Sequence, residues 1–152
     1  MKNIESKQAF TMIELIFVVV IIGILAMVAI PRLAATRDDA EITKARTMVA
    51  SVRNALAMER QKRILRGNFD TINAVGGTTT GVFGNFDDNT SKPMVLEYAE
   101  TSSSNNGRWE FISATNTYRF HCRALGGAVD FNVTNGRFIC DDTTDGCQQL
   151  TR

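Results

Sequence analysis

The chain has 152 residues, of which 44% are hydrophobic, and a formal net charge of +1. This length suits one ordinary domain and leaves little room for a second. The near-neutral charge disfavours nucleic acid as the main partner, because nucleic-acid-binding proteins concentrate basic residues on one surface.

Charge is segregated along the chain. Residues 32–66 hold nine Lys or Arg and four Asp or Glu, a net charge of +5, whereas residues 67–152 hold six and ten, a net charge of −4. Opposite charges of this kind would let the middle of one copy attract the end of another copy. The alternative is a basic helix that is simply solvated.

The N-terminal fifth contains one long apolar segment, FTMIELIFVVVIIGILAMVAIP, at residues 10–31. Only Thr11 and Glu14 interrupt its apolar and glycine residues before Pro31. As a helix, the stretch from Phe10 to Ile30 would be about 31 Å long, roughly the thickness of the hydrocarbon core of a bilayer. The sequence therefore predicts a membrane-spanning helix.

Two ordinary interpretations of this segment remain open. A removable secretory signal would explain the basic start, MKNIESK, but its apolar core is usually about 7–15 residues long, and a cut near Ala34–Ala35 is only weakly marked. A plain single-pass anchor fits the length. It leaves Glu14 unexplained, because a charge within the bilayer costs about 2.5–3.5 kcal/mol or more.

The polar leader followed by AFTMIELIFVVVIIGILAMVAIP resembles the N-terminus of type IV pilins and type II secretion pseudopilins. The resemblance implies that a prepilin peptidase cuts between Ala9 and Phe10 and methylates the new amine of Phe10. It places Glu14 at the family's fifth-position glutamate, and Gly23 and Pro31 at its helix glycine and proline. The family usually has glycine where this chain has Ala9, so slower processing is expected.

Two roles are open for Glu14. Thr11 and Glu14 fit a T-x-x-E capping box, in which Thr11 is the N-cap of the helix. In the family, the corresponding glutamate pairs with the terminal amine of a neighbouring subunit, which here would be the amine of Phe10. Such a pair neutralises the acid in a medium of low dielectric constant and sets the axial register between subunits. We expect the assembly role, with the cap alone as the alternative.

Gly23 and Pro31 give the membrane helix two weak points. Proline removes a helix hydrogen bond, and glycine lowers helix stability by about 1 kcal/mol relative to alanine. Both residues therefore predict a segment that bends when subunits pack. Ordinary tolerance of glycine and proline in membrane helices is the equal alternative.

Residues 32–66 are expected to continue as an amphipathic stem helix. Its apolar stripe, at spacings of three and four, consists of Ile42, Ala45, Val49, Val52 and Leu56. Charged residues, including Glu59, are expected on the wetter sides. Gly67 follows the basic sequence RILR, which predicts that the helix ends at Arg66.

The remaining residues, 67–152, form the expected head. Residues 67–107 are rich in Gly, Asn, Thr and Ser and predict mostly loop and variable surface, with a short strand or helix near MVLEYAE. From RWEF onward the period is two, and Asn135-Gly136 suits a two-residue hairpin turn. The predicted fold is therefore α+β, a long N-terminal helix packed on a small antiparallel β-meander.

Each predicted strand has an apolar face and a polar face. The apolar face, expected to pack on the stem, collects Trp109, Phe111, Tyr118, Phe120, Cys122, Val129, Phe131, Val133, Phe138 and Cys140. The polar face collects Glu110, Arg119, His121, Arg123, Asp130 and Arg137.

Three cysteines, Cys122, Cys140 and Cys147, can pair if the head is exported to an oxidising compartment. Cys122 and Cys140 would lie two strands apart, about 9–10 Å, which is too far for a disulfide. We prefer Cys140–Cys147 with Cys122 as a buried thiol. A bond between Cys122 and Cys147 is the main alternative.

The sequence contains no pattern that predicts catalysis. Asp141, Asp142 and Asp145 make a loop with the composition of a weak calcium candidate, but no EF-hand spacing is present. His121 is the only histidine, and no nucleophile–base pair, phosphate loop or metal-ligand spacing accompanies it. We expect neither an enzyme nor a cofactor.

Taken with the resemblance, the sequence predicts a structural subunit of a pilin-like filament, and we prefer a type II secretion pseudopilin. The alternatives are a type IV pilus subunit, including one of a DNA-uptake pilus, and a monomeric anchored binding protein. The expected parts are a leader at 1–9, a transmembrane and assembly helix at 10–31, a stem at 32–66 and an extracytoplasmic head at 67–152.

The resemblance also implies the partners and the location. The chain is expected in the bacterial inner membrane as a single-pass protein, with its head in the periplasm until it joins a periplasmic or surface filament. Expected partners are other pilin-like subunits in a homo- or hetero-polymer, the prepilin peptidase and the assembly platform of a secretion or pilus machine. No nucleic acid is expected.

Overall fold

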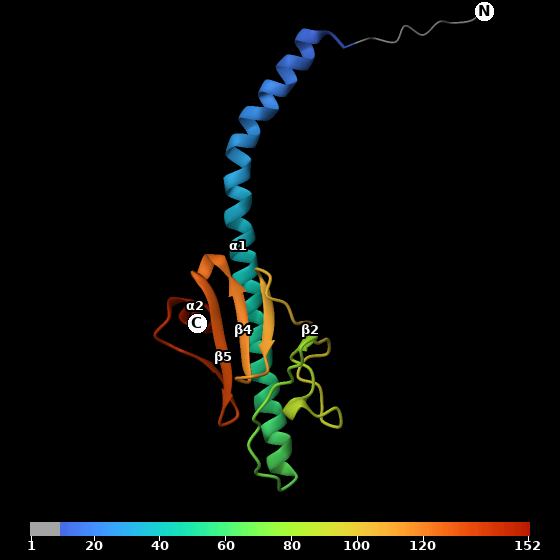
Figure 1. Cartoon of the computed structure of the whole chain (residues 1–152), viewed down its shortest axis with the longest axis vertical. Coiled ribbons are helices and arrows are strands. Elements are labelled where there is room, and N and C mark those ends of the chain that lie inside the picture. Colours follow the sequence, from blue (N-terminus) through green and yellow to red (C-terminus); the bar gives the residue numbers. More distant parts are fainter. Residues whose placement is uncertain (1–9) are drawn as a thin grey trace, which may run out of the picture. The chain divides into compact units, whose positions relative to one another are not determined.

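The computed structural model describes residues 10–152, so the predicted leader and Ala9 lie outside the described residues. The chain divides into two compact units, one ending at Arg37 and the other running from Asp38 to Arg152. Helix α1, Met12–Leu65, has 54 residues and contributes to both units (Figure 1).

In the first unit, α1 is apolar and exposed. Its most hydrophobic 18 residues have a mean hydropathy of 3.1, and none of that stretch is buried. By length and composition, this helix can cross a membrane. It begins as a capped helix, because the Glu14 N–H donates to Thr11 Oγ1 at 3.3 Å. It remains continuous through Gly23 and Pro31.

The second unit contains the predicted meander, a four-stranded antiparallel sheet in the order β3-β4-β5-β6 (Figure 1). Its strands are β3 Arg108–Ile112, β4 Thr117–Cys122, β5 Gly127–Thr134 and β6 Arg137–Cys140. Thr134 pairs with Arg137 across the turn, and Asn135 and Gly136 have φ of 53° and 70°. Both positive values match the turn predicted from Asn-Gly.

The shorter elements surround this sheet. Strands β1 Gly81–Val82 and β2 Glu100–Thr101 form a separate two-stranded sheet, and β2 lies at the end of MVLEYAE, where a short element was predicted. Two 3₁₀ turns occupy Phe86–Asp88 and Arg123–Leu125. Helix α2, Asp145–Thr151, was not predicted; its N-cap is Thr144, whose side chain accepts a hydrogen bond from the Cys147 N–H.

The core lies between the stem part of α1 and the apolar face of the sheet. From α1 it takes Ala45, Val49, Val52 and Leu56, while Ile42 is only partly buried. The sheet supplies mainly aromatic side chains, and Trp109 lies 5.1 Å from Phe83 in an edge-on arrangement. The predicted packing of helix stripe on sheet face is confirmed.

The stretch 67–107 differs from the prediction of a mostly variable surface. It places six large hydrophobic side chains in the core: Ile72, Val75, Val82, Phe83, Phe86 and Val95. These residues are interspersed with glycine and polar residues at irregular spacings, so no periodicity marks them. They are held by hydrogen bonds to distant parts of the chain, such as that from the Val75 N–H to the Tyr118 hydroxyl at 3.0 Å.

Helix α1 ends at Leu65, one residue before the predicted end, in the manner that its glycine predicts. Gly67 has φ of 75°, and its N–H donates to the carbonyl of Ile64 at 2.9 Å. The Asn68 N–H donates to the carbonyl of Arg63, also at 2.9 Å. These two bonds form a Schellman motif, which requires the left-handed conformation that glycine adopts without strain.

Candidate functional site

The N-terminal end of α1 presents one carboxylate on an apolar, solvent-exposed surface. Phe10 is 78% exposed, and nearly every side chain from Met12 to Ile30 is exposed. Within residues 10–152, the Glu14 carboxylate forms no hydrogen bond or ion pair with another side chain. The chain itself therefore provides no partner for this acid among the described residues.

A buried ion cluster joins the last turns of α1 to the loop that follows. Arg63 Nε lies 3.0 Å from Glu59 Oε1, and Arg63 Nη2 lies 2.7 Å from Asp87 Oδ2. The prediction that Glu59 lies on a wet side of the helix is wrong, because only 5% of it is exposed. Its spacing from Leu56 continues the apolar stripe, and Arg63 occupies the next position.

The charges of this cluster stabilise one another. Burial alone would lower the pKa of the Arg63 guanidinium, but hydrogen bonds to Asp87 and Glu59 outweigh it and raise that pKa. Burial would likewise raise the pKa of Asp87, but the Asn73 N–H, at 3.1 Å, and Arg63 outweigh it and lower that pKa. Both shifts favour the charged forms of Arg63 and Asp87, and the ion pair between them fixes the loop to the helix.

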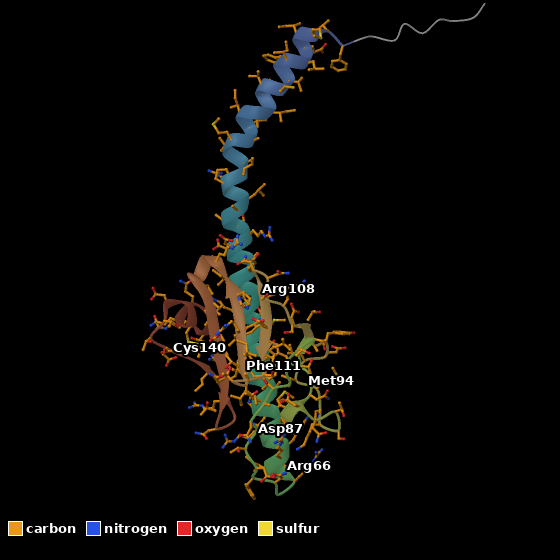
Figure 2. The ribbon with its side chains drawn as sticks, viewed as in Figure 1. Arg66, Asp87, Met94, Arg108, Phe111 and Cys140 are labelled. Atoms are coloured by element: carbon orange, nitrogen blue, oxygen red, sulfur yellow. A yellow bond between two sulfur atoms is a disulfide. The ribbon has the colours of Figure 1, made fainter. Side chains whose placement is uncertain are left out.

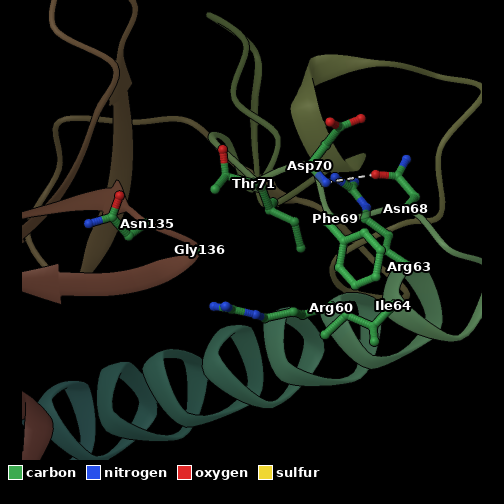
Figure 3. Close-up of a pocket in the computed structure, with 10 residues that line it drawn as sticks. Arg60, Arg63, Ile64, Asn68, Phe69, Asp70, Thr71, Asn135 and Gly136 are labelled. Carbon is green, nitrogen blue, oxygen red and sulfur yellow. Dashed lines mark hydrogen bonds between the residues drawn. The ribbon is translucent and has the colours of Figure 1, made fainter.

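Three arginines, Arg46, Arg53 and Arg60, lie seven residues apart on α1, beside the buried stripe. The first two bind carbonyl groups of the C-terminal region: Arg46 Nε donates to Gln149, and Arg53 Nε donates to Phe138 at 3.1 Å. The side chain of Arg60 extends toward the Asn135-Gly136 turn (Figure 3).

A small cavity of about 70 Å³ lies beside Arg60. Figure 3 shows its lining residues, which come from the end of α1, the chain after it and the β5–β6 turn. Arg63, Phe69 and Thr71 are among its lining residues. Its size suits a few water molecules rather than a substrate.

Cys140 and Cys147 form a disulfide, with 5.8 Å between their Cα atoms, which is the pair preferred from the sequence. Cys122 is a free thiol and only 2% exposed. The bond closes the segment between β6 and α2, so it fixes the C-terminal helix to the edge strand of the sheet.

The acidic segment inside this disulfide is organised by its own hydrogen bonds. Asp141 Oδ1 accepts from the Thr143 N–H at 3.0 Å and from its hydroxyl at 2.7 Å, and these bonds lower the pKa of Asp141. Asp145 lies in the first turn of α2, and the Asp142 carbonyl accepts from Gln148. Within residues 10–152, no group of three acidic, histidine or cysteine side chains is placed to hold a metal ion.

The outer face of the sheet carries paired charges, as its alternation predicts. His121 Nε2 lies 2.8 Å from Glu110 Oε2, and Arg119 binds Asp130 through two contacts of 2.6 and 2.7 Å. These residues are partly or fully exposed, and the arginine lowers the pKa of Asp130. The first contact is a surface hydrogen bond, and the second is a surface ion pair between neighbouring strands.

Comparison with known proteins identifies the N-terminal segment. A family model described as the prokaryotic N-terminal methylation motif matches residues 6–30. The chain is 33% identical over 102 residues to the type IV narrow pilus major component PilA5 of Thermus thermophilus, an alignment that covers 66% of this chain and 88% of that protein.

Two further relatives are type II secretion system core proteins G, from Vibrio cholerae and Escherichia coli. They are 40% and 34% identical to this chain over 58 residues, which is 38% of this chain and 40% of each relative, so the chain matches less than half the length of these two proteins. No solved structure is significantly similar to the chain.

The motif, the long helix packed on an antiparallel sheet and the alignment over 88% of a pilin define a class of protein. The chain belongs to the type IV pilin and type II secretion pseudopilin family. Members of this family are structural subunits rather than enzymes.

Proposed function

We propose that the chain is a structural subunit of a pilin-like filament, held in the inner membrane by α1 until it polymerises. The observation that carries this proposal is the Glu14 carboxylate, which has no partner within residues 10–152 and lies in the otherwise apolar and exposed stretch from Met12 to Ile30. Lipid covers the apolar side chains but does not neutralise the carboxylate, whereas a second subunit can do both.

The charge pair forms after processing. A prepilin peptidase cuts between Ala9 and Phe10 and methylates the new amine, which remains positively charged. This amine then pairs with Glu14 of a neighbouring subunit. In a medium of low dielectric constant the attraction is strong, and the lipid has already removed much of the hydration of both groups.

Each part of the chain has its own role in anchoring and assembly. Residues 10–31 span the membrane once and later line the filament core, residues 32–66 form the stem, and residues 67–152 form the head on the periplasmic side. Gly23 and Pro31 let the core helix bend as subunits pack. The partners are the peptidase, the assembly platform and other pilin-like subunits.

Two machines are candidates for the filament. The small head and the 40% identity to a secretion core protein G favour a type II secretion pseudopilin. A type IV pilus is the second candidate, because the 102 residues aligned with the pilus component exceed the 54 residues of α1 and so extend beyond the helix.

The charge pair is tested with Glu14→Val in the native host. We expect the variant to remain in the membrane and to be cut and methylated at Phe10, while filament formation falls below detection. Membrane fractionation, mass spectrometry of the mature N-terminus and electron microscopy of filaments measure these three properties. Thr11→Ala is the matched control, because it removes the cap, worth about 1 kcal/mol, and leaves the acid in place.

Two results would contradict the proposal. Normal filaments from Glu14→Val would exclude the charge pair, and a mature protein that begins at Met1 would exclude the processing step. Deletion of the gene distinguishes the machines, because loss of secreted proteins indicates a pseudopilin, whereas loss of surface fibres indicates a pilus subunit.

A further inference from the structure

The head has an open groove between α1 and the edge strand β6. Its volume is about 570 Å³, and its lining includes Arg53, Arg60 and Arg137 together with the apolar side chains of Ala57 and Ile139. Ile139 is 43% exposed, although it lies in a strand. The groove therefore combines positive charge with an accessible apolar floor.

Two of these arginines have no partner in the part of the chain that the structure describes. Among residues 10–152, the guanidinium groups of Arg60 and Arg137 form no hydrogen bond or ion pair, and both side chains are exposed. Asp142 is the single acidic residue in the groove lining, which leaves a net positive charge. Arginine in an apolar setting is typical of the centre of protein interfaces.

The segment Met94–Tyr98 has the complementary properties. Met94 is 51% exposed and Tyr98 is 81% exposed, and the exposed Glu97 lies between them in sequence. Within residues 10–152, the Glu97 carboxylate has no partner. By contrast, the nearby Glu100 is already bound by Lys44 and Arg108, at 2.9 and 3.0 Å.

The chain holds this segment in place before any partner binds. Val95 is only 6% exposed, and its N–H donates to the carbonyl of Gly84 at 2.6 Å. Asn85 forms an isolated bridge with Met94, and its side chain donates to the carbonyl of Lys92 at 2.8 Å. A preorganised surface loses little conformational entropy when it binds.

The groove and the segment belong to opposite edges of the head. The groove lies at β6, one edge of the four-stranded sheet, whereas β2, directly after the segment, contacts β3 at the other edge. Met94 and Cys140, the last residue of β6, accordingly lie toward opposite sides of the head in Figure 2. One copy cannot join its own two surfaces.

We propose that the Met94–Tyr98 segment of one subunit docks into the Arg53–Arg60–Arg137 groove of the next. Glu97 binds the arginines, and Met94 and Tyr98 cover Ala57 and Ile139. Because two different surfaces meet, the contact is heterologous. Each subunit uses its segment toward one neighbour and its groove toward the other, so the contact continues from subunit to subunit. We call this the lateral contact, because it joins the heads of neighbouring subunits in addition to the N-terminal helices. It rests on the proposal that the chain forms filaments.

Charge selects a second copy as the occupant. The one charged residue of the segment, Glu97, is an acid without a partner within residues 10–152, whereas the groove holds three arginines and one aspartate. The chain thus carries both halves of a complementary contact. An unrelated acidic partner would leave the exposed Met94 and Tyr98 without a role.

The test is a pair of cysteines in the full chain, Arg60→Cys with Glu97→Cys, expressed in cells that assemble the filament. We expect a ladder of disulfide-linked multimers on a non-reducing gel, because each subunit offers one cysteine to each neighbour. Each single variant should give no ladder. The matched control is Arg123→Cys with Glu97→Cys, which places the first cysteine at an exposed site outside the groove and should also give no ladder.

A charge exchange gives a second readout. Glu97→Lys should reduce the yield of filaments about fivefold, the effect expected for one exposed ion pair of favourable geometry. Combining it with Arg60→Glu should restore most of the yield. Arg123→Glu, in place of Arg60→Glu, should restore none.

The outcomes separate this contact from the proposed function. Filaments that form without a ladder from the Arg60–Glu97 pair would overturn the lateral contact alone, as would covalent dimers from Arg60→Cys by itself, because these would place groove against groove. A processed wild-type chain that forms no filaments would overturn the proposed function. A ladder in the paired variant together with restored yield after the charge exchange would establish the contact.

Discussion

Up to Arg37, helix α1 exposes nearly every side chain, whereas beyond Asp38 the same helix buries a stripe of six residues. Both parts have the same backbone hydrogen bonding, so the difference lies only in what covers the side chains. Helix geometry is therefore no guide to where the stability comes from. The stem is stabilised within its own chain, and the N-terminal part depends on its surroundings.

The sequence of each part shows the same contrast. The stem alternates apolar and charged positions, as a helix with one buried face requires. The N-terminal part has apolar residues on all sides, and a continuous exposed apolar surface of this size marks a membrane or an interface between proteins. Between Met12 and Ile30, only Glu14 breaks this surface, at the end where the helix begins.

Removal of residues 1–37 is the strongest test of this contrast. We expect the fragment 38–152 to lose all membrane association, because the predicted spanning segment is gone. Its free energy of unfolding should stay within about 0.5 kcal/mol of that of the full chain in detergent, because the buried core lies in the second unit. The fluorescence of Trp109, the single tryptophan, reports unfolding in denaturant.

A fragment that fails to fold would show that the N-terminal part stabilises the head, and would contradict the division into two units. Retention of the fragment in the membrane would show that the head has a membrane contact of its own. The full chain extracted in the same detergent serves as the reference for both measurements.

The second prediction compares two arginines three residues apart on the stem. Arg63→Met leaves Glu59 and Asp87 in the cluster without their guanidinium partner, so the free energy of unfolding should fall by about 3–5 kcal/mol. Arg60→Met replaces an exposed side chain that has no partner within residues 10–152, so the free energy of unfolding should change by less than about 0.5 kcal/mol. Denaturant unfolding followed through Trp109 measures both variants.

Equal effects of the two variants would show that the buried cluster adds nothing beyond an exposed charge. The proposed lateral contact predicts the reverse order for assembly, because Arg60→Met should impair filaments while leaving the head stable. Measuring stability and filament yield on the same variants therefore separates the two roles.

The smallest effects are expected at two glycines. Gly23 lies in the N-terminal part of α1, and Gly67 follows the end of α1. Gly67→Ala places a side chain at φ of 75°, with no atom within 4 Å to clash, so the cost is that of the left-handed backbone, about 1 kcal/mol. Gly23→Ala has open space around it and lies in the other unit, so it should leave Trp109-monitored unfolding unchanged. A loss of stability from Gly23→Ala would contradict the independence of the two units.

Local patterns in the sequence predict most of the fold. Spacings of three and four place Ala45, Val49, Val52 and Leu56 on one face, and alternation places Trp109 and its neighbours on the apolar side of the sheet. Turns with positive φ follow from glycine at positions 67 and 136. In each case the physical cause acts over a few residues, so the sequence displays it.

What the sequence hides depends on contacts between distant residues. Arg63 and Asp87 lie 24 residues apart, and only the folded chain brings them within 2.7 Å. The one local signal was the position of Glu59 and Arg63, which continue the buried stripe as an acid–base pair one turn apart. The Arg53–Arg60–Arg137 groove could not be predicted from the sequence for the same reason, because it combines side chains of α1 and β6.

The binding of Arg53 to the Phe138 carbonyl has a consequence for how this protein avoids aggregation. An edge strand such as β6 offers unpaired backbone groups to any strand that approaches it, which is a route to aggregation. Strand β6 has only four residues, and the guanidinium occupies one of its carbonyl groups. Pairing of this edge with the backbone of another strand is thereby hindered.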